Sequence, residues 1–205
     1  MGNTLSSSMI HDYETVSPPY GSGNLDIVIG PMFAGKTKFI IDKYNELLKD
    51  YKKEDIAVIN HISDIRYSTE PNKLFSHDKE YIPCISTDQL INIRSKLKSN
   101  PFIFLINEAN FFPDLIEFVE NEVDKNGSYI ILAGLNGDYK RQPFGNLLSL
   151  ISYADNIKYL KATCSICKNN KALFSKRTGS DSQDQKLIGT DIYKPVCRIC
   201  YFETE

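Results

Sequence analysis

Several features are missing from this sequence of 205 residues, and each absence narrows what the protein can be. No apolar run approaches the roughly 20 residues that a membrane-spanning helix needs. No signal peptide is visible, because the first apolar-rich stretch comes after residue 24 and is far too short. We therefore expect an intracellular, cytoplasmic protein.

The sequence also lacks an excess of charge of either sign. Its 24 basic and 26 acidic residues give a formal net charge of −2, so electrostatic binding to nucleic acid is not expected. Tryptophan is absent, but 12 tyrosines and 11 phenylalanines suffice to build a core. The 41% of hydrophobic and 24% of charged residues match ordinary globular usage, which excludes disordered and fibrous classes.

Composition divides the chain into three expected parts. Residues 1–23 are rich in Ser, Thr, Gly and Pro and indicate a flexible tail. The tail begins Met-Gly-Asn-Thr-Leu-Ser, which fits the pattern for N-myristoylation at Gly2, although an unmodified tail fits equally well. One acyl chain anchors only marginally and no Lys or Arg precedes Lys36, so no stable membrane attachment is expected. Residues 24–160 form the main domain, and residues 161–205 form a small appended unit.

Short β-branched runs alternate with helical patterns through the main domain. Strands are expected at residues 25–29, 56–59, 102–106 and 129–133. Helices are expected after residue 35 to about Asp50, from Asp88 to Leu97, and from Pro113 to just before Gly127. Buried strands separated by helices predict an α/β fold, a parallel sheet with helices on both faces.

The first motif that carries chemistry is a phosphate-binding loop. Gly-Pro-Met-Phe-Ala-Gly-Lys-Thr at residues 30–37 fits the pattern G-x-x-x-x-G-K-[ST] and lies between an expected strand and helix. Such a loop turns backbone N–H groups toward phosphate oxygens at the positive end of a helix. Lys36 would reach the β- and γ-phosphates and Thr37 would coordinate Mg²⁺, so the chain is expected to bind ATP with magnesium in a P-loop NTPase-like fold.

The second motif follows the strand at 102–106. In P-loop folds the strand beside the phosphate loop ends with an acid that holds the magnesium water shell, and a nearby carboxylate can act as a base. Here these positions hold Asn107 and Glu108. Asn107 can accept a hydrogen bond from a metal-bound water but brings no charge, which makes Glu108 the candidate proton acceptor.

The third motif is a pair of C-x-x-C sequences, separated by 29 residues. Two such pairs in a chain without a secretory signal indicate a structural zinc site with four thiolates rather than disulfides. A redox dithiol is the alternative, but it would leave one pair unexplained. A metal would also stabilise an appended unit too short to be held by apolar burial alone. The four expected zinc ligands are Cys164, Cys167, Cys197 and Cys200.

The chain as a whole resembles the thymidine kinases of the type shared by animal cytosol, bacteria and large DNA viruses. The resemblance covers nearly all of residues 25–202. It rests on the phosphate loop, on Asp-x-Arg-Tyr-Ser at 64–68, on Glu-x-x-Phe-Phe at 108–112, on Lys-Arg-Gln-Pro-Phe-Gly at 140–145, and on Val-Cys-Arg-x-Cys-Tyr-Phe at 196–202.

The resemblance implies transfer of the γ-phosphate of ATP to the 5′-hydroxyl of thymidine, with deoxyuridine as a further candidate substrate. It makes Glu108 the catalytic base and the long loop between the cysteine pairs a lasso that closes on the thymine base. It also implies a homotetramer and dTTP as a feedback inhibitor. For ATP and magnesium it implies Gly30, Pro31, Met32, Phe33, Ala34, Gly35, Lys36, Thr37, Asp64, Arg66, Asn107 and Asn110. For the nucleoside it implies Phe111, Leu135, Tyr139, Phe144, Gln185, Lys186, Leu187, Ile188, Gly189 and Tyr193.

Some positions depart from the family pattern. Asn107 stands where Asp is usual, Asn110 stands where Gln is usual, and the segment between the lasso glycine and the third cysteine is one residue shorter than in the animal form. Asn107 keeps open the reading of a catalytically silent relative kept as a nucleotide sensor or scaffold, and a P-loop ATPase whose zinc ribbon binds nucleic acid is a second alternative.

Overall fold

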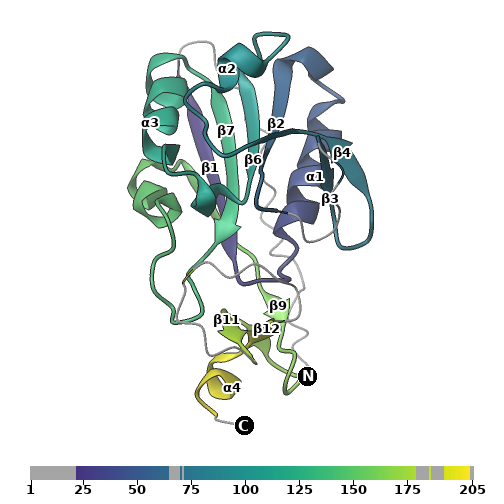
Figure 1. Cartoon of the computed structure of the whole chain (residues 1–205), viewed down its shortest axis with the longest axis vertical. Helices are drawn as coiled ribbons and strands as arrows, with labels where there is room; N and C mark the ends of the chain where they lie inside the picture. The colour runs from purple at the N-terminus through teal and green to yellow at the C-terminus, as the bar shows by residue number, and fades with distance from the viewer. Residues whose placement is uncertain (1–21, 65–69, 71, 179–184, 186–191, 204–205) are drawn as a thin grey trace, which may run out of the picture.

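The computed structural model describes residues 22–64, 70, 72–178, 185 and 192–203 (Figure 1). Its centre is a parallel sheet of six strands in the order β5-β2-β6-β7-β1-β8. All five pairings within this sheet are parallel, which requires the chain to cross over between strands. The strands are β1 (Asn24–Gly30), β2 (Ile56–His61), β5 (Ile85–Thr87), β6 (Ile103–Asn107), β7 (Tyr129–Leu135) and β8 (Asn156–Tyr159).

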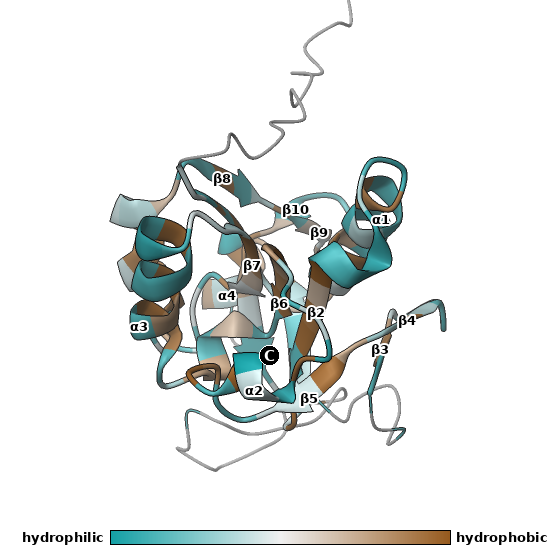
Figure 2. Cartoon of the chain, turned by 90° about the horizontal axis from the view of Figure 1, so that it is seen from above, coloured by the Kyte–Doolittle hydropathy of each residue, from teal (hydrophilic) through white to brown (hydrophobic). Residues whose placement is uncertain are grey.

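Helices and a hairpin cover the two faces of the sheet, and each face has its own apolar core (Figure 2). On one face lie α1 (Lys36–Leu47) and the antiparallel hairpin of β3 (Lys73–Phe75) and β4 (Tyr81–Pro83). The other face carries α2 (Ile93–Lys96), the short helix η2 (Ala109–Phe111), α3 (Leu115–Val119) with its continuation η3 (Glu120–Lys125), and η4 (Leu147–Tyr153). The predicted α/β class with helices on both faces is confirmed.

Successive residues of the central strands serve opposite cores. Phe104 and Ile106 of β6 belong to one cluster, while Ile103 and Leu105 belong to the other. Because side chains alternate across a strand, a strand with an apolar layer on each side must be apolar throughout. This is why the sequence 102–106 has no polar residue.

The last part of the chain lies beyond the carboxyl ends of the strands (Figure 1). Its described residues form two short antiparallel pairs and one helix turn. These elements are β9 (Ala162–Thr163), β10 (Lys171–Ala172), β11 (Phe174–Arg177), β12 (Tyr193–Val196) and α4 (Arg198–Phe202). Their small core contains Cys164, Cys197 and Cys200 with Val196.

Several elements differ from the expectation: the helix at 88–97 is shorter, and the strands β3, β4, β5 and β8 were not predicted. The helix predicted for 88–97 is only the single turn α2, and the backbone N–H groups of Leu90 (2.7 Å) and Ile91 (2.8 Å) before it donate to the carboxylate of Asp114. The strand β8 was not predicted, since it is an edge strand with mostly exposed side chains and no apolar pattern. Within the described residues no helix is long and apolar enough to cross a membrane.

Candidate active site and metal centre

The phosphate-binding loop joins β1 to α1 at the carboxyl edge of the sheet. Gly35 stands immediately before α1 with φ 84°, a left-handed conformation that only glycine adopts without strain. Gly30 ends β1, and a Cβ atom there would lie 2.5 Å from the carbonyl oxygen of Leu160. The two glycines of the motif therefore meet two separate needs, a reversed turn and a close backbone contact.

Lys36 is held inside this loop. Its side chain is buried and donates hydrogen bonds from Nζ to the carbonyl oxygens of Gly30 (3.1 Å) and Pro31 (2.8 Å). These contacts hold the ammonium group beside the backbone of the loop, where a phosphate would be bound.

A polar network connects the start of α1 to the ends of β2 and β6. Thr37 Oγ1 donates to Asn107 Oδ1 (3.4 Å), and Asn107 Nδ2 donates to Asn60 Oδ1 (3.0 Å) and Asp64 Oδ2 (3.4 Å). Asn60 Nδ2 also donates to Asp64 Oδ2 (3.2 Å). Hydroxyl, amide and carboxylate oxygens are ligands that Mg²⁺ accepts, so these residues fit a magnesium site carrying one negative charge.

Glu108 follows β6 directly and has φ 53°, a strained left-handed conformation for a non-glycine residue. Its side chain is only 4% exposed. It lines a pocket of about 330 Å³ together with the phosphate loop from Phe33 to Lys38 and with Ser76, His77 and Asp78 of the β3–β4 turn. This volume is near the small end of the range of roughly 300–1,000 Å³ for ligand pockets. A carboxylate and the phosphate loop thus share one cavity.

Asn110 contacts the end of β7 and the segment that follows it. Its Oδ1 accepts the backbone N–H of Leu135 (3.0 Å), and its own backbone approaches Gly145 so closely that a Cβ there would lie 1.9 Å from the Asn110 carbonyl oxygen. Gly145 also has φ 63°. The observed role of Asn110 is to fix the segment after β7, which carries several expected nucleoside residues.

The aromatic residues expected at the nucleoside form two groups along residues 136–145. Phe111 and Phe144 meet edge to face, with ring centroids 5.1 Å apart. The guanidinium of Arg177 lies 3.7 Å from the Tyr139 ring centroid and donates to the Tyr193 hydroxyl (2.7 Å). Residues that are far apart in the sequence, Phe111, Arg177 and Tyr193, are therefore grouped around the aromatic residues of the loop at 136–145.

Gln185 and Tyr201 connect this loop to the appended unit. Gln185 Nε2 donates to Asp138 Oδ2 (2.8 Å) and to the Pro143 carbonyl oxygen (3.0 Å), and the Tyr201 hydroxyl donates to the Tyr139 carbonyl oxygen (2.8 Å). The described part of the expected lasso therefore touches the segment that carries Tyr139 and Phe144.

The four expected metal ligands converge. The sulfur atoms of Cys164, Cys167, Cys197 and Cys200 all lie within 4.8 Å of one another, and those of Cys167 and Cys197 are 3.9 Å apart. A tetrahedral Zn²⁺ with Zn–S bonds of about 2.3 Å needs sulfur atoms about 3.8 Å apart. The donor set and its geometry fit zinc with no open coordination position.

The acidities of these thiols differ widely. Burial alone would raise the pKa of Cys164, but hydrogen bonds from backbone N–H groups, chiefly that of Cys197, lower it to about 6. Burial and the neighbouring thiols raise the pKa of Cys200 to about 12. Four crowded thiols do not all ionise by themselves, whereas a bound divalent cation deprotonates them. Cys84 lies elsewhere, and burial raises its pKa to about 11, as befits a plain buried thiol.

The appended unit also contacts the phosphate loop directly. The backbone N–H of Met32 donates to the Oγ of Ser175 on β11 (2.9 Å), and both partners are buried. The side chain of Asn136 donates to the carbonyl oxygen of Leu173 (3.0 Å). The phosphate loop therefore rests on the strand that leads away from the cysteine cluster.

Sequence patterns missed several residues of this site. Asn60, Ser76, Ser175 and Arg177 belong to no motif, and only their contacts reveal them. The basic pair at 176–177, within the loop between the cysteine pairs, was the one available signal for Arg177. Arg66, Lys186, Leu187, Ile188 and Gly189 lie outside the described residues, as does Gly2.

Comparisons with known proteins agree with this geometry. The profile of the family described as "Thymidine kinase" matches residues 23–201. Thymidine kinase a of Arabidopsis thaliana is 33% identical over 97% of this chain and 83% of its own length. Thymidine kinases of Yaba monkey tumor virus and of Myxoma virus (strain Uriarra) are 38% and 36% identical over 89% of this chain, and over 96% and 98% of their own lengths. On these matches and on the phosphate loop, this chain belongs to the thymidine kinase family, the kinases that transfer phosphate to thymidine.

Proposed function

We propose that this protein transfers the γ-phosphate of ATP to the 5′-hydroxyl of thymidine, giving TMP for dTTP supply by salvage. The observation that carries the proposal is the shared pocket at the carboxyl edge of the sheet, which Lys36, Thr37 and Glu108 line together. An anion-binding loop and a buried carboxylate in one cavity are the two parts that phosphoryl transfer to an alcohol needs.

The residues of the pocket divide the work between charge stabilisation and proton transfer. The backbone of residues 30–37 and the ammonium group of Lys36 would hold the phosphates and stabilise the charge on the transferring group. Glu108 would accept the proton of the 5′-hydroxyl as that oxygen attacks the γ-phosphorus. The bond to the β-phosphate then breaks, and ADP leaves with the electron pair. Arg66 is proposed to add a positive charge near the phosphates.

Magnesium would be held by Thr37, Asn107 and Asp64, and it would supply neutralising charge for the phosphates. The hydrogen bonds among these side chains, with Asn60, position their oxygen atoms before any metal arrives.

The nucleoside is proposed to lie along residues 136–145 and under the lasso. Phe111, Leu135, Tyr139, Phe144 and Tyr193 would contact it, and the backbone of residues 185–189 would read the edge of the base. Gln185 already contacts the loop that these aromatic residues share. Buried backbone groups left unpaired by the wrong base would favour thymine. Closure of the lasso would also exclude water and limit wasteful ATP hydrolysis.

Zinc at the four cysteines is proposed as structural, holding the base of the lasso. Several predictions rest on the sequence alone. They are the boundaries of the three parts, a homotetramer, inhibition by dTTP, a cytoplasmic location, and an N-terminus that is unattached or transiently acylated.

The test is turnover by the purified protein with Mg²⁺ and ATP, with and without thymidine, following TMP as well as ADP. We expect TMP that depends on thymidine, and we expect a Lys36→Met variant to lose it. ADP without TMP would favour the ATPase alternative and call for nucleic-acid titrations. Bound ATP with neither product would favour the silent relative.

A further inference from the structure

The turn of the β3–β4 hairpin faces the phosphate loop across the pocket. Leu74 and Ile82, a cross-strand pair of the hairpin, are buried in the core that also contains α1. The turn is closed by hydrogen bonds from the N–H of Ser76 to the Glu80 carbonyl oxygen (2.8 Å) and from the N–H of Lys79 to the Ser76 carbonyl oxygen (3.1 Å). The strands of the hairpin are therefore anchored in the core, and hydrogen bonds fix the conformation of its turn.

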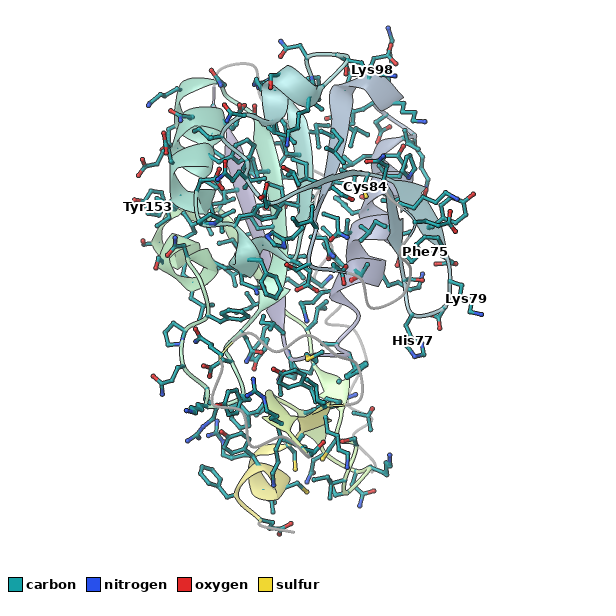
Figure 3. The ribbon with its side chains drawn as sticks, in the orientation of Figure 1. Phe75, His77, Lys79, Cys84, Lys98 and Tyr153 are labelled. Carbon is teal, nitrogen blue, oxygen red and sulfur yellow. The ribbon has the colours of Figure 1, made fainter. Side chains whose placement is uncertain are left out.

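An ion pair connects the tip to the first turn of α1. Lys38 Nζ lies 3.2 Å from Glu80 Oε2 and 2.8 Å from Asp42 Oδ1. Both acidic partners are exposed, so the energetic contribution is small, but the contact joins the turn to the helix that begins at the phosphate loop. His77 and Lys79 lie at the outer end of the hairpin (Figure 3), and His77 is 76% exposed.

Ser76 behaves differently from these exposed neighbours. It is only 2% exposed and lines the pocket, yet its Oγ has no hydrogen-bond partner anywhere in the described part of the chain. A buried hydroxyl without a partner destabilises the folded protein, because it has given up its hydrogen bonds to water. A ligand bound in the adjoining pocket would provide the missing hydrogen-bond partner of this hydroxyl.

We propose that Ser76 binds the phosphate-donor nucleotide, with its hydroxyl donating a hydrogen bond to a phosphate oxygen held by residues 30–37. Phosphate oxygens only accept hydrogen bonds, and a serine hydroxyl can turn its proton toward them. The hairpin would then form the wall of the phosphate site opposite the loop. This inference rests on the proposed function, because it assumes that a nucleotide occupies the pocket.

The experiment compares Ser76→Ala with Ser128→Ala. Ser128 is a matched control, because it is also a buried serine (1% exposed), but its hydroxyl donates to Glu122 Oε2 (3.0 Å) and it lies outside the pocket lining. Calorimetry would measure the Kd of each variant for the nonhydrolysable analogue AMP-PNP with Mg²⁺ and, separately, for thymidine. Thermal unfolding without ligand would accompany both.

We expect Ser76→Ala to weaken AMP-PNP binding about tenfold or more, to leave thymidine binding within about twofold, and to leave the Tm without ligand unchanged or higher. Ser128→Ala should lower the Tm and leave both affinities unchanged. Wild-type affinity for AMP-PNP in Ser76→Ala would overturn this inference alone. An equal loss of both ligands with a lower Tm would also overturn it, because the serine would then be structural. Failure of the wild-type protein to bind AMP-PNP would overturn the proposed nucleotide site and this inference together.

Discussion

Replacing Asn107 with aspartate restores the residue that is usual in the family, and the structure shows why this change is not simple. The Nδ2 of Asn107 donates to Asn60 Oδ1 (3.0 Å) and to Asp64 Oδ2 (3.4 Å). A carboxylate has no donor, so both contacts would become contacts between acceptors. Asn60 cannot relieve both by turning its amide, because it would then lose its own bond to Asp64.

The size of the effect follows from the geometry. Two unit charges 3.4 Å apart repel by about 5 kcal/mol at an effective dielectric constant of about 20. Protonating one carboxyl avoids this repulsion, and with an ordinary pKa of about 3.9 that costs about 4 kcal/mol at pH 7 but only about 1.5 kcal/mol at pH 5. Asp64 is half-buried, so water screens the pair and these values are upper limits.

We therefore expect Asn107→Asp to lower the free energy of unfolding by about 2–4 kcal/mol at pH 7 in magnesium-free buffer. Because protonation of either carboxyl group removes the repulsion, the loss of stability should shrink as the pH falls toward 5. Urea unfolding followed by circular dichroism at both pH values measures it. Asn121→Asp is the control, because Asn121 faces Lys125 (2.7 Å) and should show no such recovery.

Magnesium should reverse the penalty. With Mg²⁺ and ATP bound, the two carboxylates would face a cation, so Asn107→Asp should gain stability from magnesium and reach half-maximal activity at a lower magnesium concentration than the wild type. An equal loss of stability at pH 7 and pH 5, or an unchanged magnesium requirement, would refute the assignment of this network as the metal position.

Three further changes test other parts of the site. Glu108→Gln should keep the affinity for ATP and lower the rate of TMP formation by about 10²–10⁴-fold, and near-normal turnover would remove Glu108 from the role of base. Ser175→Ala takes away the acceptor of the Met32 N–H and should raise the KM for ATP several-fold while leaving the KM for thymidine unchanged. Ser165→Ala is its control, because among the described residues that hydroxyl bonds to the Pro195 carbonyl oxygen (3.0 Å) within the appended unit, and an equal change in both variants would contradict the proposed contribution of the Ser175–Met32 hydrogen bond. A strong zinc chelator should release about one metal ion per chain, lower the Tm and abolish thymidine binding, whereas a chain that carries no metal would refute the zinc site.

Motifs with a fixed local geometry could be read from the sequence alone. The phosphate loop needs its glycines and its lysine at set spacings, and each C-x-x-C pair makes its own turn, so the sequence alone predicts both sites, and the structure brings the four cysteines together. The central strands at 25–29, 102–106 and 129–133 were predictable because burial on both faces demands uninterrupted apolar runs. The family follows from these motifs in combination.

Only the tertiary structure decided which of these residues meet. Asn60, Asn107 and Asp64 come from the ends of two neighbouring strands, and no local pattern says that their side chains share one set of hydrogen bonds. The contact of Ser175 with Met32 joins residues 143 positions apart, and the unpartnered hydroxyl of Ser76 is visible only because the hairpin packs beside α1. The spacing of residues along the sequence determined which chemical groups the sites contain, whereas long-range packing determined which groups contact one another. The reason is that hydrogen bonding and burial depend on distances in space, which periodicity along the chain does not encode.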